Sequence, residues 1–315
     1  MRRAVAVALA CLALGPLAPG AAGAAGRSHR VAAGQTLGRI ARRYGVTVDA
    51  LRRANDLPPR ARLRVGQRLA IPEPGEQPPH DEAPPSAAPA PAPESLPAPE
   101  SLPVPGTEPA YYYAPTGPGR LGLRPVIMYL HGRGGRPAAD CRRWAGVARN
   151  LGWVVCPSGQ EDRGDGARGW DNDWPNAQRV VLATLAALRE RHGRRVQLRG
   201  NTLIGFSEGA YVAMNVGVRN PRTFNRWLIL AADSKYWGGP GVEALGQARG
   251  QVKRVYLITG AQDGVYEGTL QVRRWLQQAK VPTRASLPED LGHEVPLERR
   301  AGMYRAALWW LDRAG

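Results

Sequence analysis

Ser207 stands in a five-residue pattern that is typical of activated nucleophiles. The segment from Gly205 to Gly209 reads Gly-Phe-Ser-Glu-Gly and fits the pattern Gly-x-Ser-x-Gly. Its two glycines allow a sharp turn between a strand and a helix, which exposes the serine hydroxyl. A serine hydroxyl attacks a carbonyl carbon only when a base removes its proton. The pattern therefore predicts acyl chemistry only if the chain also provides a base and an acid.

His293 is the candidate base. It lies in the segment Glu-Asp-Leu-Gly-His-Glu-Val, and the other four histidines of the chain all precede Ser207. In chains that use the serine pattern in this way, the catalytic residues follow in the order serine, acid, histidine. An ordinary histidine in a surface loop is the competing interpretation.

Three aspartates are candidates for the acid, which would hold the imidazole in one tautomer and stabilise its protonated form. Asp263 ends the apolar stretch Val-Tyr-Leu-Ile-Thr-Gly-Ala-Gln-Asp and is the first choice. Asp233 ends the preceding apolar stretch and is the second choice. Asp290 is the third.

A glycine-rich segment, His131 to Gly135, follows another apolar stretch and reads His-Gly-Arg-Gly-Gly. Backbone N–H groups in such a loop can hold the negative oxygen that develops during acyl transfer. We expect the donors to be the N–H groups of Glu208 and Arg133, with Gly132 as the alternative to Arg133. An ordinary glycine-rich turn is the competing interpretation.

The elements that must position these residues alternate in type. Five stretches are almost continuously apolar, as expected for parallel strands covered on both faces: residues 124–132, 153–159, 201–207, 226–233 and 254–263. Helical patterns lie near residues 138–150, 176–192, 208–219, 266–280 and 297–313. The alternation predicts an α/β fold with a doubly wound, mostly parallel sheet. Active sites of such sheets lie at the carboxyl ends of the strands, where the candidate residues are.

Two loops at this edge of the predicted sheet carry aromatic side chains. Residues 170–174 read Trp-Asp-Asn-Asp-Trp, and Tyr236 and Trp237 follow the stretch that ends at Asp233. Such aromatic side chains can stack on a sugar or an acyl group, or can pack the loops together. The sequence contains no metal-ligand spacing and no phosphate-binding loop. We therefore expect neither a metal nor a cofactor.

The serine pattern, the acid, the histidine and the glycine-rich loop, in this order on these elements, make residues 110–315 resemble the α/β-hydrolase family. Its small secreted esterases and its dienelactone-hydrolase-like members are the nearest branches. The resemblance implies cleavage of a carboxylic ester by Ser207, His293 and Asp263. The family also includes serine peptidases, so a peptide bond is the alternative. A non-catalytic peptidoglycan-binding protein with an inactive hydrolase-like domain is the alternative from another class.

The N-terminal part of the chain contains a second predicted domain at residues 28–72, with the order strand, helix, helix, strand. Residues 29–72 resemble a LysM domain through Gly-Gln-Thr-Leu at 34–37, Tyr-Gly-Val at 44–46 and Val-Gly-Gln-x-Leu-x-Ile-Pro at 65–72. The resemblance implies binding to the N-acetylglucosamine of peptidoglycan or chitin. The expected contacts are Gly34, Gln35, Thr36, Leu37, Asn55, Asp56 and Leu57. For Leu37 a place in the core, and for Asn55 a helix-end cap, are competing interpretations.

The remaining segments predict export. Residues 1–24 combine two arginines, an apolar run too short to span a bilayer and an Ala-Gly-Ala site, which is typical of a signal peptide. A lipoprotein anchor at Cys11 is the alternative. Residues 73–109 are rich in proline, alanine and glutamate and predict an extended linker. No later stretch is long and apolar enough for a transmembrane helix. We therefore expect a protein of the periplasm, the cell envelope or the extracellular medium.

Two cysteines, Cys141 and Cys156, remain after removal of the predicted signal peptide. In an exported protein such a pair predicts a disulfide, and two buried thiols are the alternative.

The net charge of +17 comes almost entirely from arginine, since the only lysines are Lys235, Lys253 and Lys280. This preference indicates a coding bias at least as much as an anionic partner. No stretch alternates basic and aromatic residues as a surface for single-stranded nucleic acid does. The expected partners are therefore a glycan and an ester, and not a nucleic acid.

Overall fold

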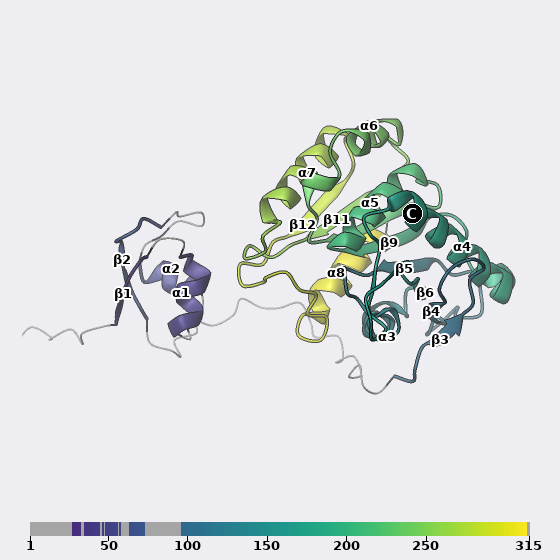
Figure 1. Ribbon diagram of the computed structural model, residues 1–315, viewed down its shortest axis with the longest axis horizontal. Helices are drawn as coiled ribbons and strands as arrows, with labels where there is room; N and C mark the ends of the chain where they lie inside the picture. Colours follow the sequence, from purple (N-terminus) through teal and green to yellow (C-terminus); the bar gives the residue numbers. More distant parts are fainter. Residues whose placement is uncertain are drawn as a thin grey trace, which may run out of the picture. The chain divides into compact units, whose positions relative to one another are not determined.

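The computed structural model describes residues 27–32, 35–44, 46, 48–55, 57, 63–72 and 96–313. They fall into two compact units, one within residues 1–79 and one within residues 80–315, and each is described by itself (Figure 1). The predicted signal peptide and residues 73–95 of the predicted linker lie outside the described residues. So do two of the predicted glycan contacts, Gly34 and Asp56.

The small unit has the predicted order of elements. These are β1 (Ser28–Arg30), α1 (Leu37–Tyr44), α2 (Val48–Arg53) and β2 (Arg68–Ala70). The two strands pair antiparallel, with His29 opposite Leu69. Apolar side chains from both helices and both strand ends form a small core: Val31, Ile40, Ala41, Leu51, Leu69 and Ile71. Burial of these side chains is what holds so short a segment in one fold.

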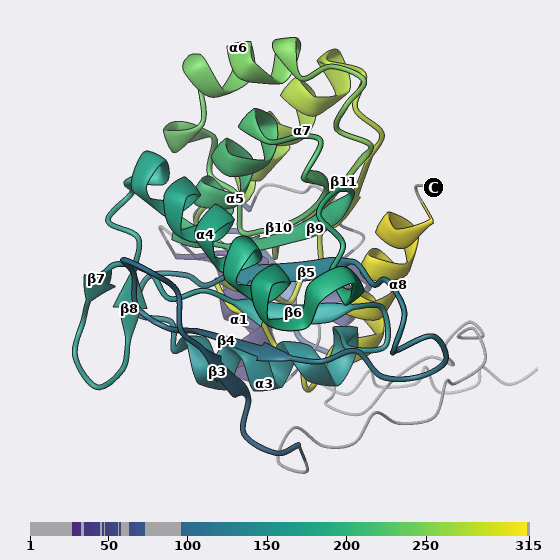
Figure 2. The same cartoon turned by 90° about the vertical axis from the view of Figure 1, so that its right-hand side faces the viewer.

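The large unit is built on one eight-stranded sheet with the order β12-β11-β10-β9-β5-β6-β4-β3 (Figure 2). The six strands from β12 to β6 run parallel. Strand β4 pairs antiparallel with β6, and β3 pairs antiparallel with β4. The doubly wound, mostly parallel sheet predicted from the sequence is thereby confirmed. The strands are β3 (Glu100–Leu102), β4 (Ala110–Tyr113), β5 (Val126–Leu130), β6 (Trp153–Cys156), β9 (Asn201–Phe206), β10 (Phe224–Leu230), β11 (Arg254–Ile258) and β12 (Thr283–Ser286).

Helices cover both faces of this sheet, because the strands are apolar on both sides. On β5, Met128 belongs to the buried cluster of one face and the next residue, Tyr129, to that of the other. Side chains of four helices lie in the first cluster: α4 (Trp174–His192), α5 (Glu208–Arg219), α6 (Pro240–Gln247) and α7 (Tyr266–Gln278). Those of α3 (Pro137–Ala148) and α8 (Ala301–Asp312) lie in the second.

Short elements lie between these helices and strands. The hairpin of β7 (Glu161–Asp162) and β8 (Arg168–Gly169) follows β6, and the 3-10 helix η2 (Gly193–Arg195) follows α4. A second 3-10 helix, η3 (Ser234–Tyr236), follows β10. Across the described ranges, no helix has both the length and the apolar character needed to cross a membrane.

The boundary that we predicted for the linker, residue 109, is wrong. Strand β3 pairs with β4 in the main sheet, with Leu102 opposite Ala110. Leu96 and Leu102 are buried, so the leucines of the proline-rich repeat contribute to the core. The composition of residues 73–109 suggested a fully solvated spacer because the few apolar side chains are separated by prolines. The structure shows that at least residues 96–109 belong to the large unit.

The predicted disulfide is also wrong, because Cys141 and Cys156 are both free and buried. The Cys141 thiol donates a hydrogen bond to the carbonyl oxygen of Tyr111, at 3.3 Å. Burial raises the pKa of the Cys156 thiol well above its ordinary value, which keeps it protonated and unreactive. The two residues are therefore small apolar side chains of the core between the sheet and α3.

Candidate active site

Ser207 occupies the sharp turn between β9 and α5. Its backbone has φ +53° and ψ −118°, a conformation that side-chain-bearing residues rarely adopt. The turn is possible because the residues two positions before and after Ser207 are glycines. A Cβ atom on Gly209 would lie 2.1 Å from the carbonyl oxygen of Leu130, and one on Gly205 would lie 2.3 Å from that of Gly209. The turn thus has the tight strand-to-helix geometry that the sequence pattern predicts.

The structure brings Ser207, His293 and Asp263 together although they are far apart in the chain. Nε2 of His293 lies 2.9 Å from the Ser207 hydroxyl oxygen. Nδ1 of His293 lies 3.0 and 2.9 Å from the two carboxylate oxygens of Asp263. Because Asp263 can only accept, Nδ1 carries the proton and Nε2 is left as the acceptor for the serine hydroxyl.

The side chains of Asp263 and His293 differ in exposure. The Asp263 side chain is 2% exposed, whereas that of His293 is 45% exposed. One Asp263 oxygen also accepts the backbone N–H of Val265, at 3.0 Å, which fixes the carboxylate. The hydrogen bond from Asp263 raises the pKa of His293, while partial burial of the ring opposes the rise. Asp263 thus favours the protonated imidazole that would form after proton transfer.

The other two candidate acids do not contact His293. Asp233 uses its carboxylate to accept the backbone N–H of Lys235, at 2.9 Å, and so caps η3. Asp290 is paired with Arg300. Among the three aspartates, the structure therefore places only Asp263 at the histidine, in agreement with the first choice from the sequence.

The two residues expected to provide oxyanion donors, Glu208 and Arg133, line the same cavity as Ser207. Glu208 opens helix α5, whose N-terminus carries a partial positive charge. Arg133 lies in the turn after β5. Within residues 96–313, neither N–H is used in a hydrogen bond. The Gly132 carbonyl oxygen stabilises this turn by accepting from Gly135 N–H at 2.9 Å and from the His131 ring, while its N–H, the alternative donor, is likewise in no hydrogen bond within residues 96–313.

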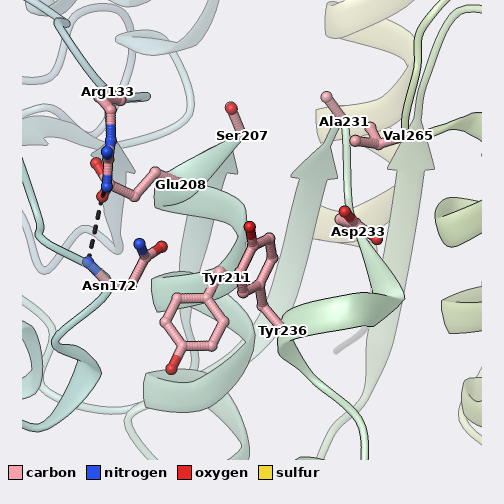
Figure 3. A pocket seen from close by; sticks show the side chains of 9 residues that line it. All are labelled: Arg133, Asn172, Ser207, Glu208, Tyr211, Ala231, Asp233, Tyr236 and Val265. Atoms are coloured by element: carbon pink, nitrogen blue, oxygen red, sulfur yellow. Dashed lines mark hydrogen bonds and ion pairs between the residues drawn. The ribbon is translucent and has the colours of Figure 1, made fainter.

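The carboxylate of Glu208 joins the nucleophile turn to both neighbouring loops. One oxygen accepts from the Arg133 guanidinium at 2.8 Å and from Asn172 N–H at 3.2 Å (Figure 3). The other oxygen accepts from Trp170 N–H at 3.0 Å. The Glu208 side chain is 4% exposed. We did not predict this role from the sequence, although an acidic side chain in the first turn of an apolar helix is a usable signal.

His131 is a structural histidine. It is 1% exposed and stacks on Trp170, with ring centroids 5.1 Å apart. Its Nδ1 donates to the Gly132 carbonyl at 2.8 Å, and its Nε2 accepts the Gly159 N–H at 3.0 Å. Burial lowers the pKa of His131 to about 4, so the ring is neutral and holds three loops together.

A cavity of about 240 Å³ opens beside Ser207 (Figure 3). Of the aromatic residues expected at its mouth, only Tyr236 lines it, with 51% of the residue exposed. Trp170 and Trp237 are buried and pack the loops. The full lining is Arg133, Asn172, Ser207, Glu208, Tyr211, Ala231, Asp233, Tyr236 and Val265.

Two of the predicted glycan contacts of the small unit, Asn55 and Gln35, use their side chains in hydrogen bonds inside the unit. Asn55 is fully engaged inside the unit: its amide nitrogen donates to the carbonyls of Leu51 and Ala70, and its oxygen accepts Ala70 N–H at 2.7 Å. The amide oxygen of Gln35 lies 2.8 Å from Nε2 of His29 and accepts Ala32 N–H at 2.8 Å. The Gln35 amide nitrogen is the part of that side chain suited to a ligand.

Three further glycan positions are described. Leu37 and Leu57 are partly buried against the core of the small unit, which fits the core interpretation of Leu37. Thr36 is exposed and precedes α1. In the parts of the chain that the structure describes, no group of three or more histidine, cysteine, aspartate or glutamate side chains is arranged to hold a metal ion.

Comparison with known proteins identifies the two units separately. A family model of the LysM domain matches residues 29–72, and this unit is a LysM domain. No curated protein sequence matches the chain.

Solved structures similar to the chain come from several organisms. An uncharacterized protein from Bacillus cereus ATCC 10987 has a TM-score of 0.52 and 18% identity, over 61% of this chain and 61% of that chain. Dipeptidyl peptidase 4 from Porphyromonas gingivalis has a TM-score of 0.50 and 19% identity, over 68% of this chain and 35% of that chain. An acylaminoacyl peptidase from Pyrococcus horikoshii has a TM-score of 0.51 and 12% identity, over 70% of this chain and 42% of that chain.

This chain thus matches less than two thirds of the length of each of these proteins. At such identities the likeness concerns the fold. The large unit has the α/β-hydrolase fold.

Proposed function

We propose that the protein is an exported serine hydrolase that cleaves a carboxylic ester. The observation that carries the proposal is the continuous hydrogen-bonded relay from Ser207 through His293 to the buried Asp263. A relay of this kind turns a weak hydroxyl nucleophile into an effective one. The conformation of Ser207 and the donors beside it support the same reaction class.

The reaction proceeds in two halves. Nε2 of His293 takes the Ser207 proton as the serine oxygen bonds to the ester carbon, and the N–H groups of Arg133 and Glu208 hold the carbonyl oxygen as it becomes negative. The bond to the alcohol oxygen then breaks, and His293 returns its proton to that oxygen. Water next attacks the acyl-enzyme, giving its proton to His293. The acid leaves and Ser207 regains its proton.

The LysM domain gives this activity a location. LysM domains bind glycans that contain N-acetylglucosamine, so the domain would hold the hydrolase at peptidoglycan or a similar polymer. The predicted signal peptide agrees with such a site outside the cytoplasm. The periplasm, the cell envelope and the extracellular medium all satisfy this requirement.

Cleavage of a peptide bond by the same relay is the second candidate function. The similar structures from Porphyromonas gingivalis and Pyrococcus horikoshii are peptidases by name. We favour the ester because an alcohol oxygen is a better leaving group than an amide nitrogen for the same triad. The non-catalytic alternative is disfavoured by the intact relay, which a mere binding domain does not need.

The test is labelling of the mature protein by a fluorophosphonate, with the Ser207→Ala variant treated in the same way as the control. We expect the wild type alone to be labelled, and to release acid from p-nitrophenyl acetate faster than from a matched p-nitroanilide. Faster cleavage of the anilide would favour the peptidase. Absence of labelling in both proteins, with no turnover of either substrate, would leave the glycan-binding alternative.

A further inference from the structure

The cavity beside Ser207 is small and mainly polar. Its volume of about 240 Å³ is below the roughly 300–1,000 Å³ of pockets that hold drug-sized ligands. Its aliphatic lining consists of the small side chains of Ala231 and Val265. A long acyl chain needs a continuous apolar wall to gain from burial, and this cavity does not provide one.

Asp233 presents a fixed acceptor to the cavity. One carboxylate oxygen accepts the N–H of Lys235, at 2.9 Å, so the rotamer of the side chain is set by η3. Within residues 96–313, this carboxylate takes part in no ion pair, whereas Glu208, the other acid of the lining, is neutralised by Arg133. A half-buried carboxylate with an uncommitted oxygen is a strong acceptor for hydroxyl groups.

Tyr236 lies opposite the catalytic turn. The residue is 51% exposed, and its ring meets the ring of Tyr211 edge to face, at 6.1 Å between centroids. The Lys235 ammonium lies 5.3 Å from the same ring, which further limits its motion. Figure 3 shows the Tyr236 hydroxyl directed towards Ser207 and the Tyr211 hydroxyl directed away from it. Tyr236 thus offers both an aromatic surface and a hydroxyl to a group held beside the nucleophile.

Asn172 completes the polar lining from the loop after β8. Its backbone has φ +52°, and its N–H is bonded to the Glu208 carboxylate at 3.2 Å. The loop is therefore fixed by the residue that follows the nucleophile. Figure 3 shows the Asn172 amide directed into the space between Glu208 and the two tyrosines. An amide both donates and accepts, as a ligand with several hydroxyl groups requires.

We propose that this cavity is a saccharide subsite, in which Asp233, Tyr236 and Asn172 bind one sugar ring of the substrate. The inference rests on the proposed ester hydrolysis: the substrate is a sugar that carries a small acyl group, and the sugar is the leaving alcohol. The three side chains come from two loops of the carboxyl edge, Asp233 and Tyr236 from the loop after β10 and Asn172 from the loop after β8, and they line one cavity.

The test compares two acetate esters that share the reacting group and differ in the alcohol. These are an O-acetylated methyl glucoside and p-nitrophenyl acetate. For Asp233→Asn and Tyr236→Phe, kcat/KM with the sugar ester is expected to fall about 10-fold or more, because a hydrogen bond to the sugar is lost. With p-nitrophenyl acetate the loss is expected to be smaller, because its alcohol has no hydroxyl group for these side chains to bind. Asp165→Asn, in the exposed β7–β8 hairpin, is the matched control for the loss of one charge.

Equal losses with both esters, or no loss with the sugar ester, would overturn the subsite. If Asp233→Asn instead lowered kcat/KM selectively for alanine p-nitrophenyl ester, Asp233 would bind an ammonium group, and this would also overturn the saccharide subsite. Failure of the wild type on every ester and with the fluorophosphonate would instead count against the proposed function.

Binding of methyl glucoside to Ser207→Ala by saturation-transfer NMR then tests the subsite without turnover. A signal unchanged by the added Asp233→Asn would contradict the subsite.

Discussion

At the scale of single residues, Asp263 decides which nitrogen of His293 faces the serine. Its two oxygens lie 3.0 and 2.9 Å from Nδ1, so the proton stays there and Nε2 is free to act as the base. An amide in place of the carboxylate can donate to Nδ1 and turn the ring into the wrong tautomer. Asp263→Asn is therefore expected to lower kcat on the order of 10⁴-fold with little change in KM. A loss no larger than that of Asp290→Asn would contradict the assignment.

The same contact sets a pH dependence. The base form of His293 is neutral, and the hydrogen bond to Asp263 raises the pKa of His293 above its ordinary value. Activity should therefore be lost as the pH falls through this raised pKa, and be fully present above it. The pH profile of kcat/KM on p-nitrophenyl acetate measures this limb. In Asp263→Asn the acidic limb of the residual activity should shift to lower pH, because the hydrogen bond that raises the pKa of His293 is gone.

Glu208 acts through its neighbours. Its carboxylate holds the Arg133 side chain and the 170–172 loop, and its own N–H is a proposed oxyanion donor. Glu208→Gln keeps the shape and the N–H but replaces a charge-assisted contact to Arg133 by a weaker one. We expect kcat to fall about 10- to 100-fold, with KM nearly unchanged, since the donors would shift slightly. Glu243→Gln on the exposed side of α6 is the control, and equal effects of both would exclude a positioning role for Glu208.

At the scale of elements, the nucleophile turn depends on how closely α5 approaches β5. A Cβ atom at Gly209 would lie 2.1 Å from the carbonyl oxygen of Leu130, the last residue of β5, and 2.5 Å from that of His131, the residue after it. Gly209→Ala should therefore force the helix away and destabilise the protein by about 1–3 kcal/mol or more. Fluorophosphonate labelling of Ser207 should be lost with it.

Gly146 offers the matched control, because it lies within α3 and a Cβ atom there meets nothing within 4 Å. Gly146→Ala should leave labelling intact and raise the free energy of unfolding by up to about 1 kcal/mol. Urea unfolding measures both variants. Similar destabilisation of the two would mean that the approach at Gly209 is not the limiting contact.

Strand β3 shows that the proline-rich segment contributes to stability. Leu102 is 2% exposed and lies at the edge of the main sheet. Leu102→Ala should lower the free energy of unfolding by about 2–5 kcal/mol, as for other buried leucines. Leu121→Ala removes a leucine that is 71% exposed and should change it by no more than about 0.5 kcal/mol. Equal changes in the free energy of unfolding for the two variants would indicate that residues 96–109 belong to the linker.

At the level of the full chain, a LysM domain is joined to a second domain with its own core. The full chain should sediment with insoluble peptidoglycan, whereas a chain without residues 27–72 should stay in solution and hydrolyse p-nitrophenyl acetate equally well. Binding should persist at about 1 M salt, where the screening length is about 3 Å. Release at that salt concentration would instead assign the binding to the charge of +17.

Features that depend on neighbours in the chain could be predicted from the amino-acid sequence. The turn around Ser207 follows from two glycines, and the alternation of strands and helices follows from apolar periodicity. The LysM domain follows from residue types at fixed spacing. These patterns are local, so a single chain read from end to end contains them.

Contacts between residues that are distant in the chain became evident only from the folded structure. Asp263 and Asp233 both follow parallel strands, and only the path of the loop with His293 selects Asp263. The roles of Glu208 and Asn55 likewise depend on loops that close around them. The free thiols of Cys141 and Cys156 and the pairing of β3 depend on where the core closes. Spacing along a chain does not contain such contacts, because they form between segments that folding alone brings together.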